Sequence, residues 1–226
     1  MRICVIIPTY NESKEIAGLI SRITKLGLQV IIVDDGSLDD TASIATLGGA
    51  KVLRNNSNAG KGASLIKGYN YAIAQGFDAV ISMDGDGQHS SFDIEAFIKK
   101  AEASQDAAVI VGNRMTMTKG MPFLRILTNR FMSRLISLIT KQYIPDTQCG
   151  FRLIKKEVLQ RIDFSTSKYE TESEILIKAA RLGFKVESIP IKTIYSGQKS
   201  QINPVIDTLR FFRFIILEFL ASFKHD

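Results

Sequence analysis

Short apolar runs, each ended by a turn rich in acidic residues or glycine, constrain the fold of this chain more than any other feature. They cover residues 3–7, 30–33, 52–53, 79–83 and 107–111. Because polar and apolar residues do not alternate in them, the runs predict strands that are buried on both faces. Segments with helical periodicity separate the runs, at about residues 11–25, 39–47, 60–75 and 92–103. This alternation predicts an α/β fold with a mostly parallel central sheet and helices on both faces.

The second half of the chain has a different pattern. Residues 124–140 predict a helix in which Arg125, Arg130 and Arg134 stand among apolar residues. Two more helices and a strand are expected at residues 158–162, 172–182 and 186–191.

Neither a linker nor an internal repeat interrupts the chain, so we expect one domain over residues 1–226. About residues 1–113 are expected to form a nucleotide-binding half, and about residues 114–226 an acceptor-side half with amphipathic helices. The expected N-cap of the helix at residues 39–47 is Ser37 or Asp39.

Composition narrows the function classes. Hydrophobic residues make up 45% of the chain and charged residues 23%, which is typical of a folded protein. The net charge of +6 fits a solvated basic surface or an anionic partner such as a nucleotide, a lipid phosphate or a membrane face. Nucleic acid is not expected as a partner, because the chain lacks Trp, a basic-aromatic platform and zinc-ligand spacing. Cys4 and Cys149 are too few for a disulfide framework and fit a reduced, cytoplasmic compartment.

No segment has the roughly 18 uncharged apolar residues of a membrane-spanning helix. Residues 205–223 come nearest, but charged residues interrupt them: Asp207, Arg210, Arg213 and Glu218. We therefore expect neither a span nor a secretory leader. Residues 205–223 fit an interfacial helix, which leaves a place on the cytoplasmic face of a membrane open.

The strongest chemical motif is Asp84-Gly85-Asp86-Gly87-Gln88, at the end of an apolar run. Ligands of open parallel sheets collect at the carboxyl ends of strands, and residues two apart in an extended chain point the same way. Two carboxylates and an amide oxygen suit Mg²⁺ or Mn²⁺, which would neutralise a diphosphate leaving group. The alternative is a plain polar turn.

Three further motifs lie at similar places. Asp35, in Val33-Asp34-Asp35-Gly36-Ser37, could accept a hydrogen bond from a base or ribose, or could form part of an Asx turn. The motif Pro8-Thr9-Tyr10-Asn11-Glu12 offers a ring for a nucleobase and a carboxylate for a hydroxyl, or is an ordinary strand-to-helix turn. Gly60-Lys61-Gly62 predicts a phosphate site at a helix start, although it lacks the Walker spacing and the lysine could equally be solvated.

The ordered set of motifs resembles the family 2 inverting glycosyltransferases of GT-A fold, and within them the dolichyl-phosphate mannose synthase and polyprenyl-phosphate sugar transferase branch. The resemblance covers nearly the whole chain. It rests, in chain order, on Ile7-Pro-Thr-Tyr-Asn-Glu12, Val33-Asp-Asp-Gly-Ser37 with Asp39 and Thr41, Gly60-Lys-Gly62, Asp84-x-Asp86-x-Gln88-His89, Gly112-Asn113-Arg114 and Asp146-Thr-Gln-Cys-Gly-Phe-Arg152.

The resemblance implies a role for each motif. The nucleoside would be held by Pro8, Tyr10, Glu12 and Asp35. Metal and diphosphate would be held by Asp84, Asp86 and Gln88, with Asp86 and Gln88 as the direct metal ligands. Arg114 would lie near the diphosphate or the transferred sugar.

On the acceptor side, Arg125 and Asn129 match positions that grip the acceptor phosphate in the lipid-phosphate branch. That branch also has an Arg-containing segment before Gly-Glu-Ser-Lys; residues 195–200 differ from it and leave Lys199 as the candidate. A phosphate acceptor needs no general base, whereas a hydroxyl acceptor does. Asp146 is the first candidate base, and Glu172 and Glu174 are rivals.

The predicted activity is transfer of a sugar from a GDP- or UDP-sugar to a polyprenyl or dolichyl phosphate, by a single displacement with inversion. The first alternative is transfer to a saccharide hydroxyl in cell-surface glycan synthesis. More distant alternatives are a nucleotidyltransferase and a non-catalytic nucleotide-sugar binding module. The helix at residues 124–140 and the segment at 205–223 are expected either to contact a membrane or to pack on the core or in a homodimer.

Overall fold

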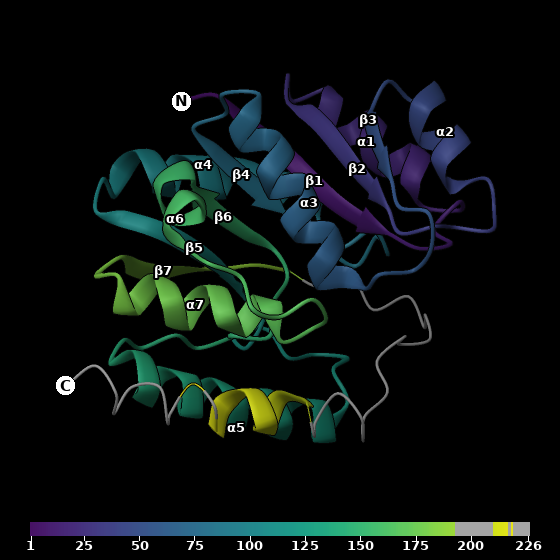
Figure 1. Cartoon of the computed structure of the whole chain (residues 1–226). Helices are drawn as coiled ribbons and strands as arrows, with labels where there is room; N and C mark the ends of the chain where they lie inside the picture. The colour runs from purple at the N-terminus through teal and green to yellow at the C-terminus, as the bar shows by residue number, and fades with distance from the viewer. Residues whose placement is uncertain (193–209, 217, 219–226) are drawn as a thin grey trace.

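The computed structural model describes residues 1–192, 210–216 and 218, and within them it has one sheet in the order β3-β2-β1-β4-β6-β5-β7 (Figure 1). The strands are β1 (Ile3–Thr9), β2 (Gln29–Asp34), β3 (Lys51–Arg54), β4 (Ala79–Ser82), β5 (Ala107–Asn113), β6 (Arg152–Lys155) and β7 (Lys185–Pro190). The helices are α1 (Ile16–Thr24), α2 (Thr41–Leu47), α3 (Lys61–Ala74), the 3₁₀ turn η1 (Ser91–Asp93), α4 (Ile94–Ala103), α5 (Phe123–Thr140), α6 (Lys156–Arg161) and α7 (Thr171–Arg181). The predicted α/β class with a mostly parallel sheet is confirmed.

Strand β6 is the element that the sequence pattern did not reveal. It has only four residues, with a charged residue at each end, so neither an apolar run nor an alternation marks it. It lies antiparallel between β4 and β5, and its first residue, Arg152, pairs with Ser82 and with Val111. The antiparallel direction brings the chain before β6 to the end of the sheet where β4 and β5 finish.

The core consists of the central strands and the apolar stripes of the helices. The predicted stripe of α1 is buried and fully excluded from solvent: Ile16, Leu19, Ile20 and Ile23. The helix itself begins at Ile16 rather than near residue 11, because residues 10–11 form a bend and residues 13–15 form a turn. Asn11 has a φ of 58°, and its N–H donates to the Ser37 hydroxyl at 2.9 Å.

The predicted N-cap of the second helix was wrong. Helix α2 begins after Asp40, whose side chain makes no capping hydrogen bond. Ser37 instead accepts from the turn at Asn11, as above, and the Asp39 carboxylate accepts the Thr41 N–H at 3.1 Å. The loop before α2 therefore ties two strand ends together instead of forming a standard cap.

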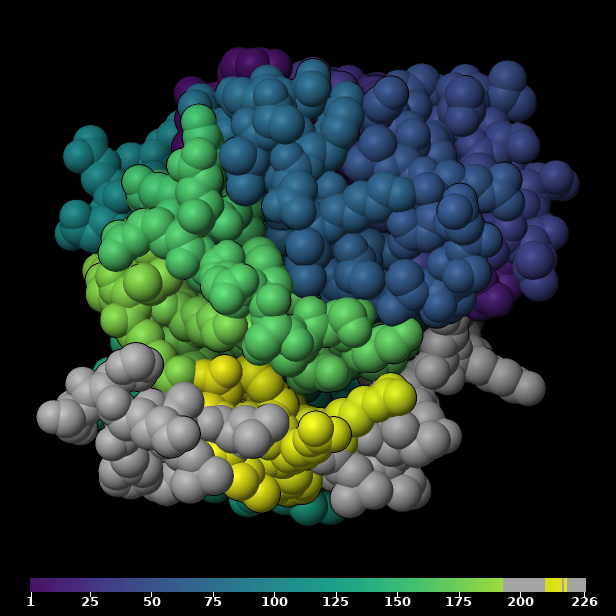
Figure 2. Space-filling model, viewed as in Figure 1, coloured from purple at the N-terminus to yellow at the C-terminus, as the bar shows by residue number. Residues whose placement is uncertain are grey.

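Helices α5 and α7 stack in layers on one side of the sheet, with α7 between the strands and α5 (Figure 1). The helical residues 210–216 lie beside them at the surface (Figure 2). The rings of Phe131 and Phe212 are 6.5 Å apart, and Arg181 of α7 forms an ion pair with Glu218. Among the described residues, no helix has the length and apolar character needed to cross a bilayer.

Candidate active site

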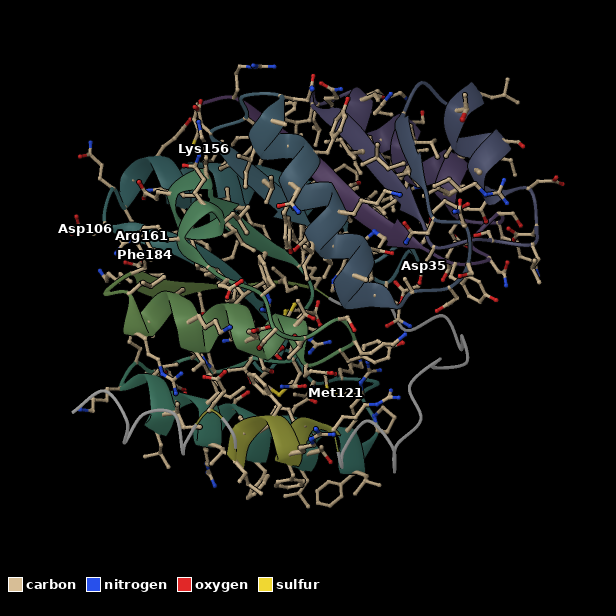
Figure 3. All side chains as sticks on the ribbon, viewed as in Figure 1. Asp35, Asp106, Met121, Lys156, Arg161 and Phe184 are labelled. Carbon is tan, nitrogen blue, oxygen red and sulfur yellow. The ribbon has the colours of Figure 1, made fainter. Side chains whose placement is uncertain are left out.

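The predicted motifs meet at one end of the sheet. The parallel strands β1, β2, β4 and β5 finish there, and β6 starts there. Figure 3 shows Asp35 at this end, whereas Asp106, Lys156, Arg161 and Phe184 lie at the opposite end. We call this end, where the acidic motifs lie, the acidic rim.

Asp35 orders the turn that precedes α3. Its Oδ1 accepts from Asn55 Nδ2 at 2.8 Å and from the Ala59 N–H at 2.9 Å. Its Oδ2 accepts from the Gly60 N–H at 2.8 Å. Gly60 has a φ of 106°, a conformation that favours glycine, so the tight turn needs this residue type. Asp35, predicted as a nucleoside contact, therefore first fixes the glycine turn against the end of β2.

The turn after β1 is held against the same region. The Glu12 N–H donates to Thr41 Oγ1 at 2.9 Å, while Pro8 and Tyr10 are half-buried beside it. Burial, and then the charges of Asp86 and Asp84, raise the pKa of the Glu12 carboxyl to about 7. Glu12 thus lies within electrostatic reach of the Asp84–Asp86 pair.

Lys61, the first residue of α3, connects the glycine turn to the acidic pair. Its Nζ is 2.5 Å from Asp84 Oδ1 and 3.0 Å from Glu172 Oε1. Burial alone would lower the pKa of Lys61, but the Asp84 and Glu172 charges raise it above its ordinary value. Burial would likewise raise the pKa of Asp84, yet Lys61 and then His89 bring it well below its usual range. The lysine is an ammonium bridging two carboxylates, not a solvated side chain.

The remaining residues of the motif offer oxygen ligands. Asp86 Oδ1 accepts the Gln88 N–H at 2.9 Å, and both side chains are half-buried. Burial, and then the Asp84 charge, raise the pKa of Asp86. In the described part of the chain, no three His, Cys, Asp or Glu side chains form a metal cage. Two carboxylates and an amide oxygen do fit Mg²⁺ or Mn²⁺, which commonly takes one or two carboxylates together with substrate phosphates.

His89 lies behind this pair. The ring is 3% exposed, its Nε2 is 3.4 Å from Asp84 Oδ2, and it packs on Phe151 with ring centroids 5.2 Å apart. A cavity of about 360 Å³ adjoins Asp86 on the α1 side and is lined in part by His89, Glu15 and Arg22. His89 is therefore a buried neighbour of Asp84.

Arg114 and Asp146 form a buried pair at the ends of β5 and the loop before β6. Arg114 Nε and Nη2 donate to Asp146 Oδ2 and Oδ1 at 2.8 and 2.9 Å, and the Arg114 N–H adds a bond of 3.0 Å to Oδ2. Asp146 is fully buried and Arg114 is 6% exposed. Because both carboxylate oxygens are engaged, the geometry favours a positioning role for Asp146 over the predicted role of general base.

Helix α5 brings the predicted acceptor residues to the same loop. Ser133 Oγ accepts the Thr147 N–H at 2.9 Å, which ties α5 to the residue after Asp146. One turn earlier on α5, Asn129 is 7% exposed, and its Nδ2 has no hydrogen-bond partner within the described part of the chain. Arg125 is half-buried one turn before that, and Lys199 lies outside the described residues.

Two rim features were missed by the sequence reasoning. Glu172 was considered as a base or as part of a solvated or helix-capping set, yet it is 9% exposed and pairs with Lys61. Gly150 was counted only as part of a motif, but a Cβ there would lie 2.8 Å from Glu172 Oε1 and 3.0 Å from the Asp84 carboxylate. Contacts between residues so distant in sequence leave no signal in spacing or composition.

A third missed feature is the loop before α7, which supports the glycine turn. Glu174, fully buried, accepts the Ser165 N–H at 2.7 Å and the Thr166 N–H at 3.0 Å. The loop so held accepts the Ala63 N–H through the Ser167 carbonyl at 2.9 Å. Both carboxylate oxygens of Glu174 accept these hydrogen bonds, so Glu174 has a structural role and ties α7 to the loop.

The sheet and its acidic rim define an α/β protein with a mostly parallel sheet and polar side chains at the strand ends, and comparison with known proteins gives the family. Residues 4–163 match the description "Glycosyl transferase family 2". The chain belongs to glycosyl transferase family 2 and is a glycosyltransferase.

Relatives with curated names cover most of the chain. A UDP-N-acetylglucosamine–dolichyl-phosphate N-acetylglucosaminyltransferase of Methanococcus voltae is 30% identical over 241 residues, which span 96% of each chain. A polyprenol monophosphomannose synthase of Mycolicibacterium smegmatis is 28% identical, over 84% of this chain and 76% of that one.

Among solved structures, glucosyl-3-phosphoglycerate synthase of Mycobacterium tuberculosis, in a complex with Mn²⁺ and UDP, has a TM-score of 0.73. The two chains are 19% identical, and the match covers 97% of this chain and 78% of the other. The likeness shows that the fold is of the GT-A type.

Proposed function

We propose that this glycosyltransferase moves a sugar from a nucleotide-sugar to a polyprenyl or dolichyl phosphate, with a divalent cation as cofactor. The curated names of the relatives support the lipid-phosphate acceptor. One observation of this chain carries the choice: each of the three candidate bases is already engaged. Asp146 is paired with Arg114, Glu172 with Lys61, and Glu174 with Lys178 and the loop before α7. Such a site suits an acceptor that is already anionic, because a phosphate oxygen attacks without losing a proton.

The donor would lie at the acidic rim. Pro8, Tyr10, Glu12 and Asp35 surround the proposed nucleoside position at the ends of β1 and β2. Asp84, Asp86 and Gln88 would hold Mg²⁺ or Mn²⁺, which neutralises charge on the departing nucleoside diphosphate. The neighbouring structure with Mn²⁺ and UDP supports this cofactor class.

The acceptor phosphate would meet α5. The unpartnered Asn129 amide supplies a buried donor, and Arg125 supplies a charge one turn away. Lys199 completes the proposed set. Arg114, oriented by Asp146, would stand between donor and acceptor and stabilise charge that develops during the displacement.

This division assigns about residues 1–113 to the donor and about residues 114–226 to the acceptor, within one domain. The buried apolar cluster supports a single domain, since it includes residues from Ile3 to Ile215.

We propose that the acceptor half lies against a membrane surface. Helix α5 exposes large apolar side chains by 54–79%: Phe123, Leu124, Leu127, Phe131 and Leu138. Four arginines are exposed on α5 and on the helical residues 210–216: Arg130, Arg134, Arg210 and Arg213. Apolar side chains among arginines are typical of a helix that lies on anionic lipid. We propose that the protein works at the cytoplasmic face of a membrane, where a lipid-linked acceptor is found; pairing of this face in a homodimer is the competing arrangement.

The test is a transfer assay with purified protein, Mn²⁺, and either UDP-N-acetylglucosamine or GDP-mannose. The acceptor is undecaprenyl or dolichyl phosphate in detergent, and mass spectrometry identifies a glycosyl phosphodiester. Product that forms only with the phosphorylated lipid supports the proposal. Product on a saccharide hydroxyl with no product on lipid phosphate would instead establish the alternative activity.

A further inference from the structure

The proposed binding of the donor and its metal does not by itself require a lysine at position 61. Asp84, Asp86, Glu12 and Glu172 bring acidic charge together at the rim, and Lys61 is the cation that pairs with two of them. Its side chain is 19% exposed, and its Nζ is within ion-pair distance of both Asp84 and Glu172. Through Asp84, the lysine occupies an oxygen that also belongs to the proposed metal-ligand set.

We propose that Lys61 competes with the divalent cation for Asp84, and that a donor diphosphate relieves the competition by offering the ammonium another anion. Cation and nucleotide then bind cooperatively, with Lys61 as the coupling residue. This inference rests on the proposed function, since it assigns a regulatory role to a residue of the donor site.

Three features of the chain support the exchange. Lysine is a flexible point charge, so its Nζ can move between anions by rotation of its side chain. Glu172 offers a pivot, because the ammonium can leave Asp84 at 2.5 Å while keeping its second partner at 3.0 Å. Lys61 is also the first residue of the 14-residue helix α3, whose N-terminal amides favour an anion such as a phosphate.

The surroundings of Lys61 leave it little other freedom. A Cβ on the neighbouring Gly62 would collide with Thr171 Oγ1, and a Cβ on Gly60 would collide with the Lys168 side chain. The glycines on both sides of Lys61 thus pack closely against Lys168 and Thr171 at the start of α7, and the lysine side chain is the part free to rotate. Coupling through one side chain obeys reciprocity: if the nucleotide tightens cation binding, the cation tightens nucleotide binding by the same factor.

The experiment measures Mn²⁺ binding by the EPR signal of the free aqua ion, with purified protein, in the absence and presence of UDP or GDP. We expect K61M to bind Mn²⁺ about tenfold more tightly than the natural protein when no nucleotide is present, because a positive charge has left the acidic rim. We also expect nucleotide to tighten Mn²⁺ binding less in K61M than in the natural protein. K61R retains the charge and should retain weak cation binding without nucleotide.

The matched control is K99M, which removes the same charge from a side chain that is 77% exposed on α4. Circular dichroism melting confirms that each variant is folded. Equal Mn²⁺ affinities of K61M and K99M, with transfer activity intact in the natural protein, would overturn the role of Lys61 and leave the proposed function standing. Failure of the natural protein to bind Mn²⁺ even with either nucleotide would remove the cation from the proposed function, and this inference with it.

Discussion

The donor side and the acceptor side of this molecule are built in opposite ways. At the donor side, the acidic side chains form hydrogen bonds and ion pairs with other groups of the protein. Three N–H groups donate to Asp35, and Asp84 contacts Lys61 and His89. At the acceptor side, helix α5 leaves Phe123 79% and Leu127 55% exposed. The donor side is therefore organised before any ligand binds, whereas the acceptor side has apolar surface that gains stability only when something covers it.

The buried Arg114–Asp146 pair lies at the proposed border of the acceptor side with the donor side, and breaking it should have the largest effect. R114M leaves a fully buried carboxylate without its partner, which typically costs about 3–5 kcal/mol of unfolding free energy. Urea unfolding measures it. The double variant R114M/D146N removes the stranded charge and should be more stable than R114M alone. Equal stabilities of R114M and the natural protein would show that the pair does not contribute to folding stability at this border.

Within the donor side, Asp86 should matter for turnover and little for folding. D86A should lower kcat/KM in the lipid-phosphate assay by about 100-fold or more, because a proposed cation ligand is lost. The melting temperature should hardly change, since Asp86 is half-buried and accepts a hydrogen bond from the nearby Gln88 N–H. D86A with unchanged turnover would refute the assignment of the cation site.

Apolar exposure at the acceptor side predicts membrane binding. L127S/F131S should weaken binding to vesicles of anionic lipid about tenfold, because two exposed apolar side chains are lost from the face of α5. The matched control is L38S, since Leu38 is 89% exposed but lies in the loop before α2 on the donor side. Vesicle sedimentation measures binding. Equal losses of vesicle binding in L127S/F131S and L38S would contradict the distinction between the two sides. A change from dimer to monomer in gel filtration of L127S/F131S would favour the homodimer.

The smallest effect is expected at Glu187 on β7, which pairs with Lys100 at 2.5 Å. Hydrogen bonds from Lys100 and then Lys185 hold the pKa of Glu187 at about 2, below its ordinary value. A lowered carboxyl pKa gives stability that is present above about pH 4.5 and is lost as the pH falls toward 2. K100M should therefore cost at most about 1 kcal/mol at pH 7 and less at pH 3, since the pair is partly solvated. Urea unfolding at both pH values checks this; a larger loss at pH 3 would contradict it.

Sequence reasoning located the donor side better than the acceptor side. The apolar runs and their acidic turns predicted β1, β2 and β4 and placed Asp35, Asp84 and Asp86 at one end of the sheet, because parallel strands share a direction. The prediction of helix α5 was also correct to within a residue at its start. The elements against which α5 packs were not predicted, because the apolar pattern of an amphipathic helix does not identify the surface that it contacts.

The chain by itself determined the fold class, the positions of the buried parallel strands along the sequence and the acidic residues at their ends, because each of these follows from local periodicity and from the direction of parallel strands. Only the tertiary structure decided what the charged groups do. It paired Lys61 with Glu172, engaged both oxygens of Asp146 with Arg114, and inserted β6 between β4 and β5. Lys61 and Glu172, for example, are 111 positions apart in the chain. Burial and charge compensation between such residues depend on their distance in space rather than on their spacing in the sequence.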